Sequence, residues 1–353
     1  MNLSIFRAII AIAAVFQLAS CKSDSTSTGG STQPAANGAN GVVRQAIYVG
    51  NTLFVAGDFD SIGGVWIRGV GMWDGAKWAN VGSPLPVFTR SSIDALTTDS
   101  TNLYVAGQFG STIGSENLSM IARWDGSQWH HMDNSVFTFG GSNYPRALTF
   151  DDGILNAYNG VGTIEQYDGK VWTASTIYAV NPFLSMIASG GRLYAVMGYN
   201  ETNPYLWVSD SHNWAKQGGA FGTSSPDGPG VQIVARGTDV FAAGDFGQIG
   251  STVLSSYGIA HWNGSQWSSV GMLTGTVKAT AIAMDQTGVV YVAQPGKLLK
   301  YDGTSWSQVA TTAGGFGNQG LIHTIAISSG HIAIGGEFTS VNGATANYVA
   351  ILQ

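Results

Sequence analysis

A five-residue phrase, Asp-Gly-x-x-Trp, recurs along this chain and constrains its fold more than any other feature. Four copies keep the full pattern, one begins with Asn and one lacks the Gly; they close at Trp78, Trp129, Trp172, Trp214, Trp267 and Trp306. Successive closing tryptophans lie 39 to 53 residues apart. Asp-Gly favours tight hairpins because both residues tolerate positive φ. Each phrase therefore predicts the turn between the last two strands of a repeat.

A second recurrent phrase lies ahead of each hairpin. It is a continuous apolar run that often ends in Ala-Gly, found at 53–59, 103–109, 193–199, 240–246, 290–294 and 332–338, with a degenerate copy at 154–158. A run without alternation indicates a strand that is covered on both faces. Shorter apolar stretches precede it, as at 93–97, and follow it, as at 258–262. The repeat unit therefore has four strands.

Seven copies of the second strand can be counted, but only six closing hairpins. The last repeat stops at 348–353, one strand short. A spacing of roughly 44 residues is typical of propeller blades. We therefore predict an all-β, seven-bladed β-propeller of four-stranded antiparallel blades over residues 42–353. Its last blade either keeps three strands or is closed by a fourth from the segment just before Val43.

The N-terminus carries a targeting signal. Arg7 and the apolar run at 8–16 predict a signal peptide over residues 1–20, because nine apolar residues are too few for a permanent membrane span. The tetrapeptide that ends in Cys21, Leu-Ala-Ser-Cys, resembles the bacterial lipobox, in which the cysteine is acylated. Cys21 is the single cysteine of the chain, so it has no disulfide partner within it. The alternative is a plain secretory peptide with a chance cysteine.

The resemblance to a lipobox implies an anchor in the bacterial cell envelope. Lys22 stands where an inner-membrane lipoprotein would have Asp, which favours the outer membrane. Residues 21–41 are rich in Ser, Thr, Gly, Ala and Asn, and they predict a flexible tether.

A resemblance to a known repeat family supports the fold prediction. Residues 56–64 and 335–343 resemble a Gly-Gly-x-Phe-Thr-Ser-x-x-Gly repeat that continues into a Trp-Asp-Gly-x-x-Trp hairpin. Such repeats occur in secreted and surface propeller proteins of bacteria, and similar ones occur in a fungal cortical polarity-marker protein. The resemblance covers nearly the whole mature chain and implies the fold, but it implies no ligand.

The repeated tryptophans have two interpretations. Aromatic faces stack on sugar rings, and some propeller lectins bind one sugar between each pair of blades. The favoured interpretation is structural, because a buried aromatic side chain supplies about 150–250 Å² of contact to a small blade. The Asp-Gly hairpin also resembles the Asp-box of sialidase propellers, which is remote from catalysis.

Aromatic residues outside the repeat pattern are better candidates for a contact surface. Trp66 lies in the loop after a second strand, Tyr199 and Tyr205 lie in the equivalent loop of the fourth repeat, and Phe137 and Phe139 lie between repeats. Exposed aromatics on loops often anchor partners. The alternative is that they form small local cores.

Polar residues follow several second strands at one repeat position: Asp58, Gln108, Asp245 and Glu337. They are candidates to line the central channel, where converging carboxylates could bind Ca²⁺. The favoured alternative is that they accept hydrogen bonds from nearby backbone N–H groups. We predict no cofactor.

The sequence offers little support for a catalytic function. The six histidines lack metal-ligand spacing, and no nucleophile elbow or phosphate loop is present. The net charge of −6 argues against a nucleic-acid partner. We therefore expect a monomeric, non-catalytic binding or scaffold module for a protein or glycan. The competing hypothesis is a hydrolase of glycan or peptide with a polar cluster at the channel mouth.

Overall fold

The computed structural model describes residues 32–33, 38–67, 69–82, 92–113, 116–133, 135–137, 144–174, 183–197, 203–209, 214–222, 230–271, 277–328 and 330–352. The predicted signal peptide, the lipidation site Cys21 and the candidate residues Phe139 and Tyr199 lie outside these ranges. In the part of the chain that is described, no helix is long and apolar enough to cross a membrane.

The unit that spans Ser31–Gln353 is built from four-stranded antiparallel sheets. Blades 1 to 3 are formed in order by β2 (Val43–Val49), β3 (Thr52–Gly57), β6 (Val70–Trp73) and β7 (Trp78–Asn80); by β8 (Ser92–Thr98), β9 (Leu103–Ile113), β10 (Glu116–Trp124) and β11 (Trp129–His131); and by β12 (Ala147–Asp151), β13 (Ile154–Tyr158), β14 (Ile164–Tyr167) and β15 (Trp172–Ala174).

Blades 4 and 5 are formed by β16 (Phe183–Ser189), β17 (Arg192–Met197), β18 (Tyr205–Ser209) and β19 (Trp214–Gln217), and by β21 (Gln232–Arg236), β22 (Asp239–Ala243), β25 (Ile259–Trp262) and β26 (Trp267–Ser269). Blades 6 and 7 are formed by β27 (Ala281–Met284), β28 (Val290–Gln294), β29 (Lys297–Tyr301) and β30 (Trp306–Ala313), and by β31 (Leu321–Ser328), β32 (His331–Glu337), β35 (Val349–Leu352) and β1 (Thr32–Gln33).

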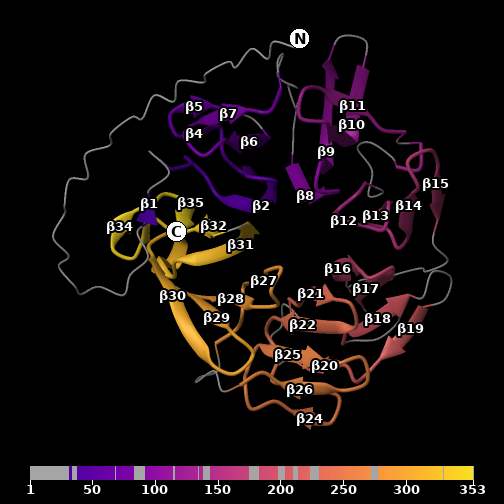
Figure 1. The fold of residues 1–353 in the computed structure, drawn as a ribbon, viewed down its shortest axis with the longest axis vertical. Helices are drawn as coiled ribbons and strands as arrows, with labels where there is room; N and C mark the ends of the chain where they lie inside the picture. Colours follow the sequence, from indigo (N-terminus) through magenta and orange to yellow (C-terminus); the bar gives the residue numbers. More distant parts are fainter. Residues whose placement is uncertain are drawn as a thin grey trace, which may run out of the picture. The chain divides into compact units, whose positions relative to one another are not determined.

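The first strands of the blades form a closed inner ring (Figure 1). Each contacts the first strand of the next blade, in the order β2, β8, β12, β16, β21, β27, β31 and back to β2. Polar contacts join them as well, since Ala46 N–H in β2 donates to Thr324 Oγ1 in β31 at 3.0 Å. The predicted all-β propeller is confirmed, and the described strands make seven blades.

The ring is closed by the N-terminal segment. Strand β1 pairs with β35, with Thr32 opposite Leu352, so the second of the two predicted closures applies. Both β1 and Ala39 lie inside the segment 21–41 that was assigned to the tether. Ala39 is buried, and its N–H donates to Asn347 O at 2.9 Å. The propeller sheet therefore reaches back to Thr32, ahead of the predicted boundary at residue 42.

Three of the repeated tryptophans, Trp129, Trp172 and Trp306, bond to the chain that leaves the preceding blade. Trp129 in blade 2 is buried, and its Nε1 donates to Val81 O, just beyond blade 1, at 2.9 Å. Trp306 makes the same bond to Val270 O, also at 2.9 Å. The structural interpretation of the closing tryptophans therefore applies to these positions.

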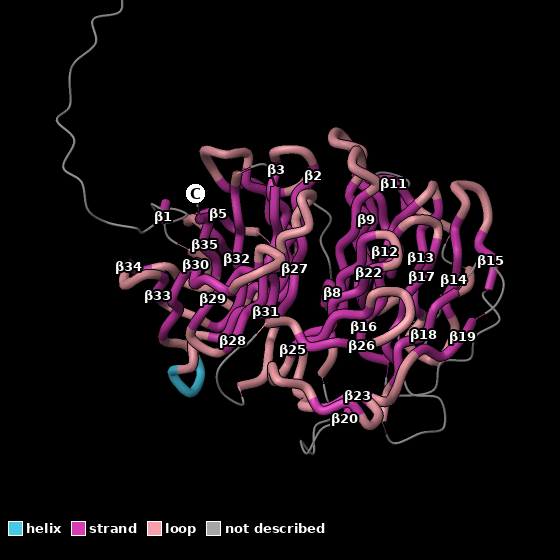
Figure 2. Tube along the Cα trace, turned by 60° about the horizontal axis from the view of Figure 1, so that its bottom comes forward, coloured by secondary structure: helices cyan, strands magenta, loops and turns pink. Residues whose placement is uncertain are grey.

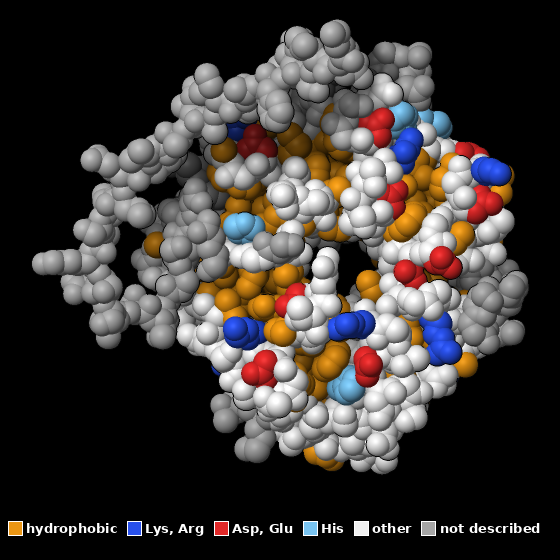
Figure 3. Space-filling view, viewed as in Figure 1, with side chains coloured by type: hydrophobic (Ala, Val, Ile, Leu, Met, Phe, Trp, Pro, Cys, Tyr) orange, Lys and Arg blue, Asp and Glu red, His pale blue; other side chains and the backbone are white. Residues whose placement is uncertain are grey.

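The propeller has two faces, which carry different connections between the strands (Figure 2). We call the "turn face" the one that carries the turns between first and second strands and the Asp-Gly turns; Figure 3 shows it, with an opening near the middle. We call the "loop face" the opposite one. It carries the connections between second and third strands and between blades, including β20 (Phe221–Gly222), β23 (Gln248–Ile249) and the 3-10 helix η1 (Phe316–Asn318).

Candidate functional site

Three blades project a short hairpin from the loop face. The hairpins are β4 (Ser61–Ile62) with β5 (Val65–Trp66), β23 with β24 (Thr252–Val253), and β33 (Ser340–Val341) with β34 (Ala344–Thr345). Each follows a buried phenylalanine at one repeat position, namely Phe59, Phe246 and Phe338. The buried phenylalanine and the Ile or Val three residues later therefore anchor the hairpin to its blade by apolar burial.

Each hairpin is also held by the chain that enters its blade or leaves the preceding one. In blade 1, Asn40 Oδ1 accepts from the N–H groups of Asp60 and Ser61 at 2.9 and 3.0 Å. In blade 7, Asn342 N–H donates to Thr311 O at 2.9 Å. These bonds hold the first strand or the turn of the hairpin, and they leave exposed the last residue of its second strand, which is Trp66, Val253 or Thr345.

Large exposed apolar side chains gather on the loop face. Among the described residues, six such side chains are strongly exposed, and five of them lie in loop-face segments: Trp66, Val161, Val253, Val277 and Phe316. Trp66 is 58% exposed and Phe316 is 87% exposed. The sixth, Val171, lies in an Asp-Gly turn on the turn face. These side chains lie in separate loop segments, and exposed aromatic residues on loops, such as Trp66 and Phe316, are candidate contact residues.

The predicted aromatic contact residues have different environments. Trp66 is exposed at the end of β5, where it pairs with Ser61. Tyr205 is half-buried, with Lys216 Nζ at 3.6 Å from its ring centroid. Phe137 is only 6% exposed and packs edge-on against Trp172, with ring centroids 5.4 Å apart. Phe137 is therefore part of a local core, the alternative considered above, and it cannot serve as an exposed anchor.

The four polar candidates at the ends of second strands also have different environments. The first strands make up the inner ring, so these residues lie one strand outward from the channel wall. Asp58 accepts a hydrogen bond from Arg44 Nε at 2.8 Å, and Glu337 Oε1 lies 3.0 Å from His323 Nε2. Their partners are therefore charged or titratable side chains of the first strands, rather than the backbone groups expected from the sequence.

Blades 7, 1 and 2 place several charges together at the loop-face mouth of the channel. The hydrogen bond to Asp58 raises the pKa of Arg44, and the charges of Glu337 and Asp94 act in the same direction. Arg44 and His323 both occupy irregular positions of their first strands, where the pairing register shifts by one residue. The bulge turns the Arg44 or His323 side chain toward the carboxylate that follows the second strand.

The other two polar candidates, Asp245 and Gln108, have different partners. Asp245 lies in blade 5, where its carboxylate accepts a hydrogen bond from Tyr257 OH and raises the pKa of that phenol to about 12. Gln108 lies in β9 of blade 2, paired with Ser92. Within the described residues, no group of three His, Cys, Asp or Glu side chains is arranged to hold a metal ion.

One further carboxyl group was not anticipated. Glu165 in blade 3 is buried, and burial raises its pKa, whereas a hydrogen bond from Asn159 Nδ2 at 3.4 Å opposes the shift. Asn159 also holds its loop through Oδ1, which accepts from the N–H groups of Val161 and Thr163. The signal in the sequence for this buried carboxyl group is the pair of polar residues Asn159 and Glu165 in the third repeat.

These features define a propeller whose loop face, where it is described, presents apolar side chains and a charged channel mouth. No protein-family model matches the chain, and no curated protein matches it in sequence. Solved structures do match. The extracellular domain of BT4673 from B. thetaiotaomicron, described as a one-component system, is 14% identical with a TM-score of 0.58 over 91% of this chain.

Two other solved propellers have similar scores. YCF48 bound to D1 peptide is 13% identical, with a TM-score of 0.56 over 92% of this chain and 94% of its own. PorZ, a surface component of the type-IX secretion system of Porphyromonas gingivalis, is 15% identical, with a TM-score of 0.57 over 90% of this chain. This chain spans 40% of the BT4673 domain and 47% of PorZ. At these identities the likeness establishes the fold alone.

Proposed function

We propose that the protein is a lipid-anchored lipoprotein of the bacterial cell envelope, held at the outer membrane, whose propeller is a non-catalytic binding or scaffold module for a protein partner. The observation that carries the proposal is the concentration of exposed apolar side chains on the loop face. They lie in blades 1, 3 and 5 and in the connections that follow blades 5 and 6. A protein interface of about 800 Å² per partner can cover several such loops, whereas one small ligand cannot.

Two further observations support a binding role. The carboxylates near the channel mouth are already engaged by Arg44, Tyr257 and His323, as expected for structural groups. A propeller of similar fold, YCF48, was solved with a peptide bound, and PorZ is a bacterial surface component. These relatives make a peptide or protein ligand in the cell envelope a natural expectation for this chain.

Two exposed valines on opposite faces provide a matched test. Val253→Ser lies on the loop face and Val171→Ser on the turn face, and both side chains are already in solvent. After crosslinking in cells that produce the full chain, we expect Val253→Ser and Trp66→Ala to reduce recovery of the partner several-fold, and Val171→Ser to leave it unchanged. Equal recovery with all three variants would exclude the loop face.

A stability control separates contact residues from core residues. Trp66→Ala should change the free energy of unfolding by no more than about 0.5 kcal/mol, as is usual at exposed positions. Trp129→Ala should cost about 3–5 kcal/mol, because it truncates a buried aromatic side chain. If Trp66→Ala is as destabilising as Trp129→Ala, Trp66 belongs to the core and is no contact residue.

A further inference from the structure

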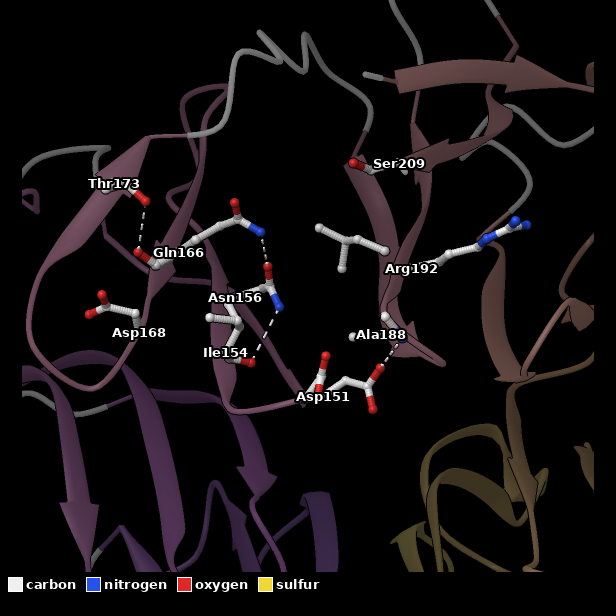
Figure 4. A pocket seen from close by; sticks show the side chains of 12 residues that line it. Asp151, Ile154, Asn156, Gln166, Asp168, Thr173, Ala188, Arg192 and Ser209 are labelled. Carbon is white, nitrogen blue, oxygen red and sulfur yellow. Dashed lines mark hydrogen bonds between the residues drawn. The ribbon is translucent and has the colours of Figure 1, made fainter. Parts of the chain in front are cut away.

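A cavity of about 270 Å³ opens on the turn face between blades 3 and 4, far from the loop-face hairpins (Figure 4). We call it the "blade 3–4 slot"; its walls include Asn156, Gln166 and Thr173 from blade 3, and Leu193 and Ser209 from blade 4. Its volume is near the lower end of the roughly 300–1,000 Å³ typical of ligand pockets.

The slot exists because two repeat positions depart from the pattern on facing walls. The strand position just before the Asp-Gly turn is aromatic in most blades, and it reads Trp73, Trp124, Tyr167, Ser209, Trp262 and Tyr301 in blades 1 to 6. The second-strand position that faces the next blade reads Phe54, Tyr104, Asn156, Tyr194, Phe241, Tyr291 and Ala333. Blade 3 therefore has Asn where five blades have a ring, and blade 4 has Ser.

Neighbouring interfaces show what the missing rings would do. Between blades 2 and 3, Tyr104 stacks on Phe150 with ring centroids 5.7 Å apart. Between blades 4 and 5, Tyr194 reaches across and its hydroxyl donates to Gly237 O at 2.7 Å. In the blade 3–4 slot no ring stands at either of the two positions, so space and polar groups remain.

The polar groups in the slot form a continuous row across blade 3. Gln166 Nε2 donates to Asn156 Oδ1 at 2.8 Å, and Thr173 Oγ1 donates to Gln166 O at 3.4 Å. Asn156 is 3% exposed, so its amide is removed from bulk water. The row is held rigid by strand pairing, which places Asn156 opposite Gln166 and Gln166 opposite Thr173.

Ser209 supplies a hydroxyl on the facing wall of the slot. It is 7% exposed, and Figure 4 shows its hydroxyl directed into the slot toward the amide of Gln166. This hydroxyl can exchange a hydrogen bond with a polar ligand or with water in the slot.

Four charged side chains line the rim, and of these Asp152 is exposed. Asp168 Oδ1 accepts the N–H groups of Lys170 and Val171 in its own turn, and Asp151 Oδ2 accepts Gly191 N–H at 2.8 Å. Arg192 points away from the slot in Figure 4. The interior therefore presents neutral amides and hydroxyls, which both donate and accept hydrogen bonds.

We propose that the blade 3–4 slot binds a single sugar residue, a neutral hexose-sized polyol whose hydroxyls pair with Asn156, Gln166 and Ser209. Each sugar hydroxyl both donates and accepts, as the wall groups do, and the apolar wall at Leu193 covers the ring. The site lies on the turn face, so it does not depend on the partner surface proposed above.

The test uses the full chain in a detergent without a sugar headgroup. Glucose, galactose, mannose and N-acetylglucosamine are titrated separately by saturation-transfer NMR, with arginine as a basic probe. We expect saturable binding of at least one sugar. Asn156→Tyr, which restores the ring of the other blades, should abolish it while keeping the fold. Ser209→Ala should weaken it roughly two- to tenfold, as for loss of one hydrogen bond.

The matched control lies in blade 5. Ser268 Oγ donates to His261 O at 3.4 Å, the same contact that Thr173 makes in blade 3, but Ser268 is exposed and outside the slot. Ser268→Ala should leave sugar binding unchanged. If Asn156→Tyr does not fold, the comparison of sugar binding by Ser209→Ala and by Ser268→Ala decides whether the slot is the binding site. Failure of all four sugars to bind, undiminished binding in the slot variants, or binding of arginine in their place would each overturn the proposal.

Discussion

At the scale of single residues, the Asp-Gly turns are held by one repeated set of bonds. In each described copy the first side chain accepts from the two backbone N–H groups that follow the glycine. For Asp74, the donors are Ala76 and Lys77, both at 2.9 Å. Asn263 makes the same pair of bonds at 3.0 Å. The turn therefore needs an oxygen acceptor at this position but does not need a charge.

The charge nevertheless makes the turns sensitive to acid. The N–H of Lys77, followed by that of Ala76, lowers the pKa of Asp74, and equivalent donors lower the pKa of Asp168 and Asp302. Because the pKa values are depressed in the folded state, the turns contribute stability above the ordinary value of 3.8, and the contribution is lost as pH falls below it.

We therefore predict that replacing Asp74, Asp168 and Asp302 together by Asn, as at Asn263, flattens the acid limb of the stability curve. The thermal midpoint of the variant should fall less between about pH 4 and pH 2 than that of the natural protein, while the two remain close at neutral pH. Parallel curves over that range would show that these carboxylates do not set the acid sensitivity.

At the scale of elements, Gly82 and Gly271 each seat a blade against the next. Gly82 follows β7 with φ of 89°, and a Cβ there would lie 2.8 Å from Trp124 Cζ3 and 3.1 Å from Trp129 Cδ1. Gly271 stands in the same relation to Trp306, with a Cβ at 3.0 Å from Nε1. The residue before each glycine supplies the carbonyl that accepts the tryptophan N–H.

Gly82→Ala should therefore destabilise the propeller by about 1–3 kcal/mol, because the added methyl group overpacks a ring interface and strains the backbone. Gly75→Ala is the control, since its φ is also positive, at 100°, but nothing lies within 4 Å of its Cβ position. Urea unfolding measures both. A loss at Gly82 that merely equals the loss at Gly75 would mean that backbone strain alone is responsible.

Sequence reasoning predicted the elements that repeat, and it offered the closing strand only as one of two alternatives. The hairpin phrase and the apolar run predicted the blades because local turn chemistry and burial act within a few residues. The closing strand β1 has two residues and no pattern of its own, so only its pairing with β35 reveals it. Phe137 looked like an exposed loop aromatic because its partner, Trp172, lies 35 positions along the chain. In the sequence, the blade 3–4 slot is indicated only by two departures from the repeat, at Asn156 and Ser209.

At the scale of the whole molecule, the direction of the closing strand shows from which face the chain with the proposed lipid anchor enters the propeller. Strand β35 runs from the loop face to the turn face, and β1 is antiparallel to it. The chain therefore enters β1 from the turn face. Residues 22–31 separate the predicted lipidation site from Thr32, and ten residues can span at most ~35 Å. For a protein acylated at Cys21, as proposed above, we therefore predict that the turn face lies nearer the membrane than the loop face.

This orientation can be measured with one dye on either face of blade 7. His331 lies beside the turn-face hairpin and Thr345 in the loop-face hairpin, and both are exposed. We expect a dye at His331→Cys, in vesicles that carry quencher-labelled lipids, to be quenched more strongly than one at Thr345→Cys. Adding Cys21→Ser to either variant should abolish both vesicle association and quenching, because the anchor is then lost. Association that persists without Cys21 would contradict the lipid anchor. Stronger quenching at Thr345→Cys in the anchored protein would contradict the orientation alone, because the chain would then have to pass round the propeller edge before it reached the membrane.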